Sequence, residues 1–388
     1  MKKRIDWAKI LLRILTYVLV AVVTCVSTMY LMLQQTGGKL TALRFLINNC
    51  FIGEVDQEAL DDGAAAGMVD ALPDRWSYYI PASEMLANTE HMENAYVGVG
   101  ITIINREDNK GFDIIQVEPT GGAKEAGVLP GDILVAVEGQ RVSEIGMDGA
   151  RALIRGKEDT QVNITVERDG QELGFTVTRK QLLVQVAAGQ MLEGNVGYIT
   201  IANFNDRCAQ ETIERIEELI AQGATSLLFD VRFNPGGYKD ELVKLLDYLL
   251  PEGDLFRSQL YTGEEAVDTS DAKCLEMPMA VLVNGDSYSA AEFFAAALDE
   301  YDWAVLVGEP TVGKGYFQST FDLGDGSAVA LSVGKYFTPN GRCLEDEGGL
   351  TPEVTVEVDQ ETASKIYAGV LEPTEDPQIQ AALEALKK

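Results

Sequence analysis

A serine-bearing turn between a predicted strand and a predicted helix is the first segment whose residues could do chemistry. Ser287 and Ser289 follow the apolar run 281–283, and a helix is expected to start near Ala290. A serine hydroxyl at the end of a strand, surrounded by the first amides of a helix, suits a nucleophile. A serine that only caps the helix occupies the same kind of position, so this turn alone leaves both interpretations open.

A lysine that precedes a predicted strand is the second such segment. Lys314 completes a Gly-x-x-x-x-Gly-Lys string that begins at Gly308, but Gly315 stands where a nucleotide-binding loop needs Ser or Thr. We therefore expect no nucleotide site. Period-two alternation places Lys314 and Gln318 on one side of the strand. An amine beside a carboxamide suits a lysine that is oriented and held neutral.

A glycine turn is the third segment. Residues 230–237 run from a strand into a Pro-Gly-Gly turn and then into a helix. At the start of a helix, Gly236 or Gly237 can present a bare backbone amide to a negatively charged oxygen. A loop that only needs positive φ angles would use the same glycines, and the segment alone does not separate the two interpretations.

Composition limits the chemistry that other residues can add. Lys and Arg number 31 against 61 Asp and Glu, and the formal net charge of −30 opposes binding to nucleic acid. The chain has one histidine, His91, so a zinc site built on several imidazoles is excluded. We interpret His91 as a surface residue. The 5 cysteines include no Cys-x-x-Cys pair. We therefore expect no metal and no cofactor.

The run 14–33 contains no charged residue and has the length that a helix needs to cross a membrane. Basic residues dominate the preceding segment 1–13, so the positive-inside rule places that segment in the cytoplasm. A cleaved signal peptide is the alternative, but the run exceeds a typical signal core and no Ala-x-Ala-like site follows it. We therefore predict a single-pass cell-membrane protein whose main part lies outside the cytoplasm.

Beyond this run, the pattern of apolar residues divides the chain into three regions. Residues 36–95 have a mostly helical pattern, and the apolar stripe of the helices in 36–72 would allow a homo-oligomer. Residues 96–180 read as a small β-rich module. Residues 181–388 alternate strands with amphipathic helices, which predicts an α/β core with a partly parallel sheet.

The small module resembles a PDZ domain in the arrangement found in bacterial proteases. The resemblance rests on Tyr-Val-Gly-Val-Gly-Ile at 96–101 and Gly-Val-Leu-Pro-Gly-Asp-Ile-Leu at 127–134. The two glycines of the first string would let consecutive amides converge on the terminal carboxylate of a peptide, and strand 101–104 would offer an edge for an added β-strand. These glycines could instead only ease a tight turn. The predicted peptide-binding residues are Val97, Gly98, Val99, Gly100 and Ile101.

Together the segments resemble the C-terminal processing peptidases, serine proteases that pair Ser with Lys and carry an inserted PDZ domain. Lys314 lies 25 residues after Ser289, as in the family pattern. Glu292 follows the serine by three residues, and Gln318 follows the lysine by four. The resemblance implies a mixed α/β (α+β) peptidase core with an inserted PDZ-like, β-rich domain, and the uncharged run 14–33 adds one N-terminal transmembrane helix. It covers nearly the whole chain beyond the uncharged run, through the further strings 74–80, 336–342, 349–352 and 376–380.

The resemblance also implies a role for each residue. Ser289 would be the nucleophile, Lys314 the general base that takes its proton and returns it to the leaving amine, and Gln318 the group that orients the lysine. A lysine base must be neutral, so burial has to lower its pKa by several units from ~10.4. The donors to the oxyanion would be the amide of Ala290 and one amide from Gly236 or Gly237.

The expected function is therefore a membrane-anchored serine endopeptidase that acts outside the cytoplasm on proteins or peptides with exposed apolar C-termini. Tyr288 and Val312 depart from the family pattern beside the serine and the lysine, but neither change removes a catalytic group. The alternative is a catalytically silent membrane scaffold whose PDZ domain captures peptide tails. Tyr288 is the only support for this alternative in the sequence.

Overall fold

The computed structural model describes residues 15–28, 38–106 and 110–387. The predicted cytoplasmic segment 1–13 lies outside the described residues, as do residues 14 and 29–33 of the predicted anchor. Residues 15–28 form a helix. Within the described ranges, no helix combines the length and the apolar character that crossing a membrane requires.

The chain forms two compact units that divide between Pro73 and Asp74. In the first unit, α2 (Gly38–Cys50) and α3 (Gln57–Asp70) follow the helix 15–28. The Asp56 side chain accepts hydrogen bonds from the amides of Glu58 and Ala59 and so caps α3. An ion pair between Arg44 and Asp61 joins the two helices. Residues 74–95, predicted as part of the helical region, group with the second unit.

A six-stranded sheet forms the centre of the second unit, in the order β10-β11-β12-β15-β16-β19. All neighbouring strands are parallel except β10 and β11. The two middle strands are buried along their whole length, as expected where helices cover both faces of a parallel sheet. The strands are β10 (Ala187–Leu192), β11 (Val196–Ile201), β12 (Ser226–Asp230), β15 (Met279–Val283), β16 (Ala304–Gly308) and β19 (Val354–Thr355).

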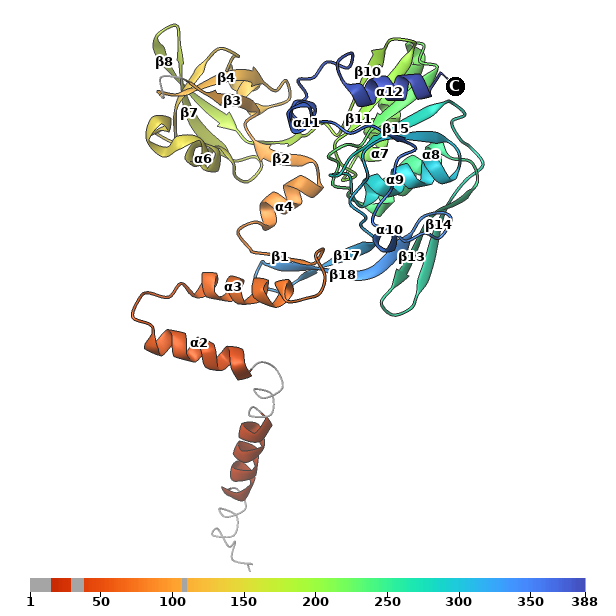
Figure 1. Cartoon of the computed structure of the whole chain (residues 1–388). Coiled ribbons are helices and arrows are strands. Elements are labelled where there is room, and N and C mark those ends of the chain that lie inside the picture. Colours follow the sequence, from red (N-terminus) through yellow and green to blue (C-terminus); the bar gives the residue numbers. More distant parts are fainter. Residues whose placement is uncertain (1–14, 29–37, 107–109, 388) are drawn as a thin grey trace, which may run out of the picture. The chain divides into compact units, whose positions relative to one another are not determined.

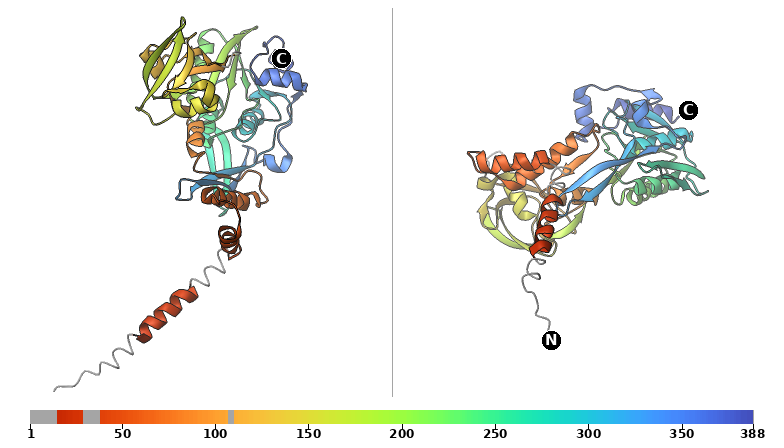
Figure 2. Two further views of the ribbon diagram at one scale, coloured as in Figure 1. Left: turned by 90° about the vertical axis from the view of Figure 1, so that its left-hand side faces the viewer. Right: turned by 90° about the horizontal axis from the view of Figure 1, so that it is seen from below.

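Helices cover the two faces of this sheet (Figure 1). Leu227 and Phe229 of β12 belong to the apolar cluster that includes α7, α8 and α9, whereas Leu228 packs in a second cluster with α12. This alternation follows from the two-residue period of a strand. Figure 2 shows the C-terminal helix α12 beside the sheet from two further sides. The helices are α7 (Cys208–Ala221), α8 (Lys239–Leu249), α9 (Ala290–Glu300) and α12 (Pro377–Ala385).

A second, antiparallel sheet has the order β1-β18-β13-β14, with β17 also paired to β18. Tyr78 of β1 pairs with Ala330 of β18, which brings residues 74–80 beside the strands that follow Lys314. The strands are β1 (Tyr78–Ile80), β13 (Gly253–Leu260), β14 (Glu265–Ser270), β17 (Tyr316–Asp322) and β18 (Ala328–Phe337). Outside the PDZ-like module, the second unit also contains the helices α4 (Met85–Met92), α10 (Leu344–Glu347) and α11 (Gln360–Tyr367).

The PDZ-like module has its own apolar core inside a sheet of order β3-β4-β5-β7-β8, with β6 paired to β5. Asp169 and Gly170 both have positive φ at the hairpin turn between β7 and β8, as a tight two-residue turn requires. The antiparallel pair β2 and β9 connects the module to the rest of the chain. The elements are β2 (Ala95–Gly98), β3 (Ile101–Asn105), β4 (Phe112–Val117), α5 (Gly122–Ala126), β5 (Ile133–Val137), β6 (Gln140–Arg141), α6 (Val142–Ile154), β7 (Gln161–Arg168), β8 (Gln171–Thr178) and β9 (Lys180–Leu183).

Candidate active site

One large cavity of about 1080 Å³ contains every residue that the sequence predicted for catalysis and for the oxyanion. Its walls come from the residues before β1, the helix α4, the glycine turn after β12, the start of α9, and the strands β17 and β18. Sequence segments that are far apart therefore meet around a single space. The predicted residues in its lining are Gly236, Gly237, Ser289, Ala290, Lys314 and Gln318.

The two serines of the turn after β15 have different positions. Ser287 is completely buried, and its hydroxyl donates to the Val231 carbonyl oxygen at 2.7 Å, so it fastens the turn to the neighbouring glycine segment. Ser289 immediately precedes α9 and lines the cavity. Its φ of 59° and ψ of −127° are unusual for a residue with a side chain, and such strain is often found at active sites. Ser289 is therefore the serine that a substrate can reach.

Glu292 connects the serine turn to the lysine loop. Its carboxylate is completely buried and accepts hydrogen bonds from the amides of Ser289 at 3.0 Å and Lys314 at 2.9 Å. It also accepts from the Gly313 amide at 2.7 Å and from the Thr311 hydroxyl. Burial raises the pKa of Glu292. One side chain thus fixes the backbone of both predicted catalytic residues.

Lys314 projects its amine into an aromatic corner. Nζ lies 5.0 Å from the centre of the Trp76 ring and 6.0 Å from that of Tyr288, and these two rings stack on each other with 6.0 Å between their centres. Burial lowers the pKa of Lys314 to about 8, although nearby carboxylates oppose this shift. The lysine therefore loses its proton far more easily than an exposed lysine does.

Gln318 holds the lysine amine in place. Nζ of Lys314 donates to Oε1 of Gln318 at 2.7 Å. The amide nitrogen of Gln318 donates to the Tyr316 carbonyl oxygen at 3.2 Å and to the Ser332 hydroxyl at 3.0 Å, which directs the oxygen toward the lysine. The register between β17 and β18 shifts at Gln318, so this glutamine lies at a β-bulge. The predicted amine–carboxamide pair is present.

The serine and the lysine are not bonded to each other. Within the ranges that the structure describes, no hydrogen bond joins Oγ of Ser289 to Nζ of Lys314. The serine oxygen instead accepts from the Tyr336 hydroxyl at 3.3 Å, and the lysine donates to Gln318. Both groups face the same cavity with different partners.

The sequence did not decide whether Gly236 or Gly237 supplies an amide to the oxyanion, and the hydrogen bonds of the glycine turn distinguish the two. The Gly236 amide already donates to Oδ1 of Asn234 at 2.8 Å. In the described part of the chain, the amides of Gly237 and Ala290 have no hydrogen-bond partner. A Cβ atom at Gly236 would lie 2.7 Å from Cβ of Ser289 and 2.8 Å from the Ala290 nitrogen, so only glycine fits there. Gly237 and Ala290 are the amides that remain open beside Ser289.

A buried polar cluster lies beneath this turn. Arg232 is nearly inaccessible, and its guanidinium donates to Asp230, to Asp376 at 2.8 Å and to Gln378 at 2.9 Å. The Tyr198 hydroxyl donates to Asp230 at 2.6 Å. The cluster therefore fastens the end of β12 to the start of α12, and with it the glycine turn.

Two residues of the site, Trp76 and Tyr336, were not predicted from single sequence segments. Trp76 and Tyr336 entered the sequence analysis only inside family strings, because each meets the site from a distant part of the chain. His91 lies exposed on α4 in the lining of the cavity, as expected for a surface residue. Within the described residues, its side chain makes no hydrogen bond to Ser289.

The predicted peptide-binding loop lies where β2 ends and β3 begins. Among the described strands β3 pairs only with β4, so its other edge is open for an added strand. The Val97 amide, however, already donates to Oε1 of Glu90 at 3.0 Å, and Oε2 of Glu90 accepts from Arg155 at 2.7 Å. Gly100 has a φ of 79°, which favours glycine. Val97 is therefore occupied, and Gly98 pairs with Lys180 of β9, so the amides that follow Gly98 are the candidates for a carboxylate.

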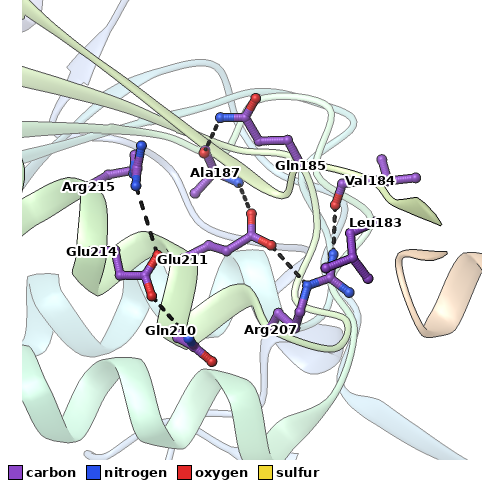
Figure 3. Close-up of a pocket in the computed structure, with 9 residues that line it drawn as sticks. All are labelled: Leu183, Val184, Gln185, Ala187, Arg207, Gln210, Glu211, Glu214 and Arg215. Atoms are coloured by element: carbon purple, nitrogen blue, oxygen red, sulfur yellow. Dashed lines mark hydrogen bonds and ion pairs between the residues drawn. The ribbon is translucent and has the colours of Figure 1, made fainter. Parts of the chain in front are cut away.

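A smaller pocket of about 400 Å³ lies between the segment joining β9 to β10 and the helix α7 (Figure 3). Its polar groups bond to one another: Arg207 pairs with Glu211 at 3.0 Å and donates to the Val184 carbonyl oxygen at 2.7 Å. The other carboxylate oxygen of Glu211 accepts from the Val186 and Ala187 amides. The hydrogen bonds across this pocket connect α7 to the segment between β9 and β10, and the residues that line it include no nucleophile.

Comparisons with known proteins find matches for the α/β core and for the β-rich module. Residues 195–356 match peptidase family S41, and residues 114–168 match a PDZ domain. The carboxy-terminal processing protease CtpA of Bacillus subtilis (strain 168) is 31% identical over 317 residues, which cover 80% of this chain and 67% of the relative. A probable CtpA-like serine protease of Staphylococcus aureus (strain COL) is 28% identical over 366 residues, covering 90% of this chain and 73% of the relative.

Among solved structures, a photosystem II D1 C-terminal processing protease is 27% identical and has a TM-score of 0.46, over 83% of this chain and 88% of that chain. The S41 match contains both Ser289 and Lys314, and the PDZ match lies inside the β-rich module. With this pair of domains and a relative of 31% identity, the chain belongs to the C-terminal processing peptidases, a family of serine proteases.

Proposed function

We propose that the protein is a membrane-anchored serine endopeptidase that acts outside the cytoplasm and cleaves proteins whose C-termini bind its PDZ domain. Ser289 is the nucleophile, Lys314 the general base and Gln318 the residue that orients the lysine. The proposal depends on one observation: burial lowers the pKa of Lys314, and this lysine lines the same cavity as Ser289.

In the first chemical step, the neutral amine of Lys314 takes the hydroxyl proton of Ser289 as Oγ bonds to the carbonyl carbon of the substrate. The carbonyl π electrons move to the oxygen, and the amides of Gly237 and Ala290 stabilise the resulting oxyanion. When the intermediate collapses, the C–N bond breaks and the lysine returns the proton to the leaving amine. Water then hydrolyses the acyl-enzyme through the same groups.

This step requires Oγ of Ser289 to approach the lysine, because the two are not hydrogen-bonded in the present geometry. The lysine has three N–H donors while charged, and it gains a lone pair on deprotonation. Gln318 can keep accepting from one N–H while the lone pair turns toward the serine. Catalytic contacts often tighten only when substrate is bound.

The proposed substrates have accessible apolar C-terminal segments. A peptide tail would add a strand along the open edge of β3, with its carboxylate at the amides that follow Gly98. Near Ser289 the cavity is lined by aromatic and aliphatic side chains that suit apolar substrate residues: Leu260, Phe256, Phe293, Phe317 and Tyr336.

The anchor and the location rest on the sequence. The uncharged run 14–33 and the basic residues before it favour a single span with a cytoplasmic N-terminus. Protease added to intact protoplasts should then digest the chain beyond residue 34, whereas digestion only after lysis would reject this orientation. Self-association through the helices of 36–72 is a further part of this proposal, and sedimentation of the full chain in detergent tests it.

The catalytic assignment is tested by cleavage of an unfolded model protein that ends in apolar residues. We expect Ser289→Ala and Lys314→Ala to lower the rate by about 10⁴-fold or more in the full chain. Loss in both variants supports the Ser–Lys pair. A Ser289→Ala protein that cleaves as fast as the wild type would reject it.

A further inference from the structure

Tyr336 is packed so that its ring has little freedom to move. It lies on β18, is 4% exposed, and contacts the Phe293 ring edge to face with 4.3 Å between ring centres. The rings of Phe256 and Phe317 lie 5.5 Å and 6.3 Å from it. Because Phe293 lies near the start of α9, directly after Ser289, this contact fixes the tyrosine relative to the serine.

The buried hydroxyl of Tyr336 has one hydrogen-bond partner among the described residues, and that partner is Oγ of Ser289. A buried tyrosine hydroxyl without a partner would be costly, so this contact satisfies the group. The tyrosine donates, which leaves the serine's own proton free for another acceptor. Burial raises the pKa of Tyr336, and the hydroxyl therefore stays protonated in the pH range where proteins function.

We propose that Tyr336 is a catalytic residue whose hydroxyl donates a hydrogen bond to Oγ of Ser289 and stabilises the negative charge that develops there. The inference rests on the proposed function, in which Ser289 is the nucleophile. During acylation, Lys314 takes the serine proton while Tyr336 keeps its own, and Oγ forms the bond to carbon. During deacylation, neutral Lys314 takes a proton from water as the water oxygen bonds to the ester carbon. The C–Oγ bond then breaks, and Lys314 gives that proton to Oγ while Tyr336 again donates a hydrogen bond to it.

The length of the contact is consistent with this role. At 3.3 Å it is longer than an ordinary O–H···O hydrogen bond, so it contributes little while the serine is neutral. A donor bonds more strongly to an oxygen that carries charge. An interaction that is weak in the ground state and strong in the transition state accelerates the reaction and does not strengthen substrate binding.

The test is Tyr336→Phe in the full chain, assayed on the same unfolded substrate. We expect kcat to fall about 10- to 100-fold while KM stays within about twofold, as for the loss of one hydrogen bond to a charged oxygen. Tyr301→Phe is the matched control, because its hydroxyl donates to the Asp254 carbonyl oxygen at 3.0 Å away from the cavity. This control should retain the wild-type kcat.

Two further measurements separate a catalytic role from a structural one. Melting temperatures of Tyr336→Phe and Tyr301→Phe should be similar, and substrate should bind equally to Ser289→Ala and to Ser289→Ala/Tyr336→Phe. A kcat of Tyr336→Phe equal to or above that of the wild type would overturn the inference. So would a loss that appears in substrate binding or in a collapsed melting temperature. Full activity of Ser289→Ala would instead reject the proposed function itself.

Discussion

Two glycine-containing segments of this protein present backbone amides, and they are fastened in very different ways. The turn before α8 follows the buried cluster of Arg232, and the side chain of Asn234 accepts a hydrogen bond from the Gly236 amide. The backbone of this turn is therefore fixed from several sides. The predicted peptide-binding loop of the PDZ-like module is fastened at one end by Glu90, whose partner Arg155 is 41% exposed. An oxyanion must be met by donors in fixed positions, whereas a peptide tail can be accommodated by a loop that adapts.

Arg232→Met should produce the largest effect, because it leaves the carboxylates of Asp230 and Asp376 buried without their partner. We expect the free energy of unfolding to fall by about 3–5 kcal/mol. Denaturant titration of the full chain measures this. The control is Arg257→Met, which breaks a surface pair with Asp254 and should cost about 1 kcal/mol or less. Equal effects of the two substitutions would contradict the importance assigned to burial.

Gly236→Ala should affect catalysis more than stability. The added Cβ would crowd Cβ of Ser289 and the Ala290 nitrogen, which displaces a proposed oxyanion donor, so we expect kcat to fall about 10²- to 10³-fold. Gly324→Ala is matched to it, because both glycines have a φ of 85° and no atom lies within 4 Å of the added Cβ at Gly324. The control therefore carries the same backbone strain without the crowding. Comparable losses of kcat in the two variants would show that strain alone is responsible.

The pH dependence of kcat/KM gives the third prediction. In the proposed mechanism Lys314 acts as a base only when neutral, and with a pKa of about 8 roughly one lysine in ten is neutral at pH 7. We expect kcat/KM to rise about tenfold per pH unit below pH 7 and to level off above pH 8. Tyr288→Phe keeps the aromatic corner and should retain this profile. A profile that is flat from pH 6 to pH 9 would contradict a lysine base.

The sequence was sufficient to predict residues that the fold brings to one cavity, whereas their catalytic roles stay a proposal. Ser289, Lys314 and Gln318 were predicted because their spacing matches the family pattern. Only the contact between Lys314 and Gln318 joins residues that are close along the chain. The contact of Trp76 with the lysine depends on the pairing of β1 with β18, which local patterns do not contain. The choice between Gly236 and Gly237 depends on one side-chain hydrogen bond of Asn234, and the two glycines look alike in the sequence.

Glu90→Gln should have the smallest effect, and it tests the fastening of the predicted peptide-binding loop. Glutamine keeps an oxygen that can accept from the Val97 amide, so only the charge facing Arg155 is lost. Because that pair is partly exposed, the free energy of unfolding should change by about 1 kcal/mol or less. The kcat for a short peptide should stay at the wild-type value, and affinity for a longer peptide with an apolar C-terminus should change by less than about threefold, as measured by calorimetry on the full chain. A large loss of kcat in this variant would mean that the fastening of the peptide loop positions the catalytic residues, and that the two glycine segments are mechanically coupled rather than independently held.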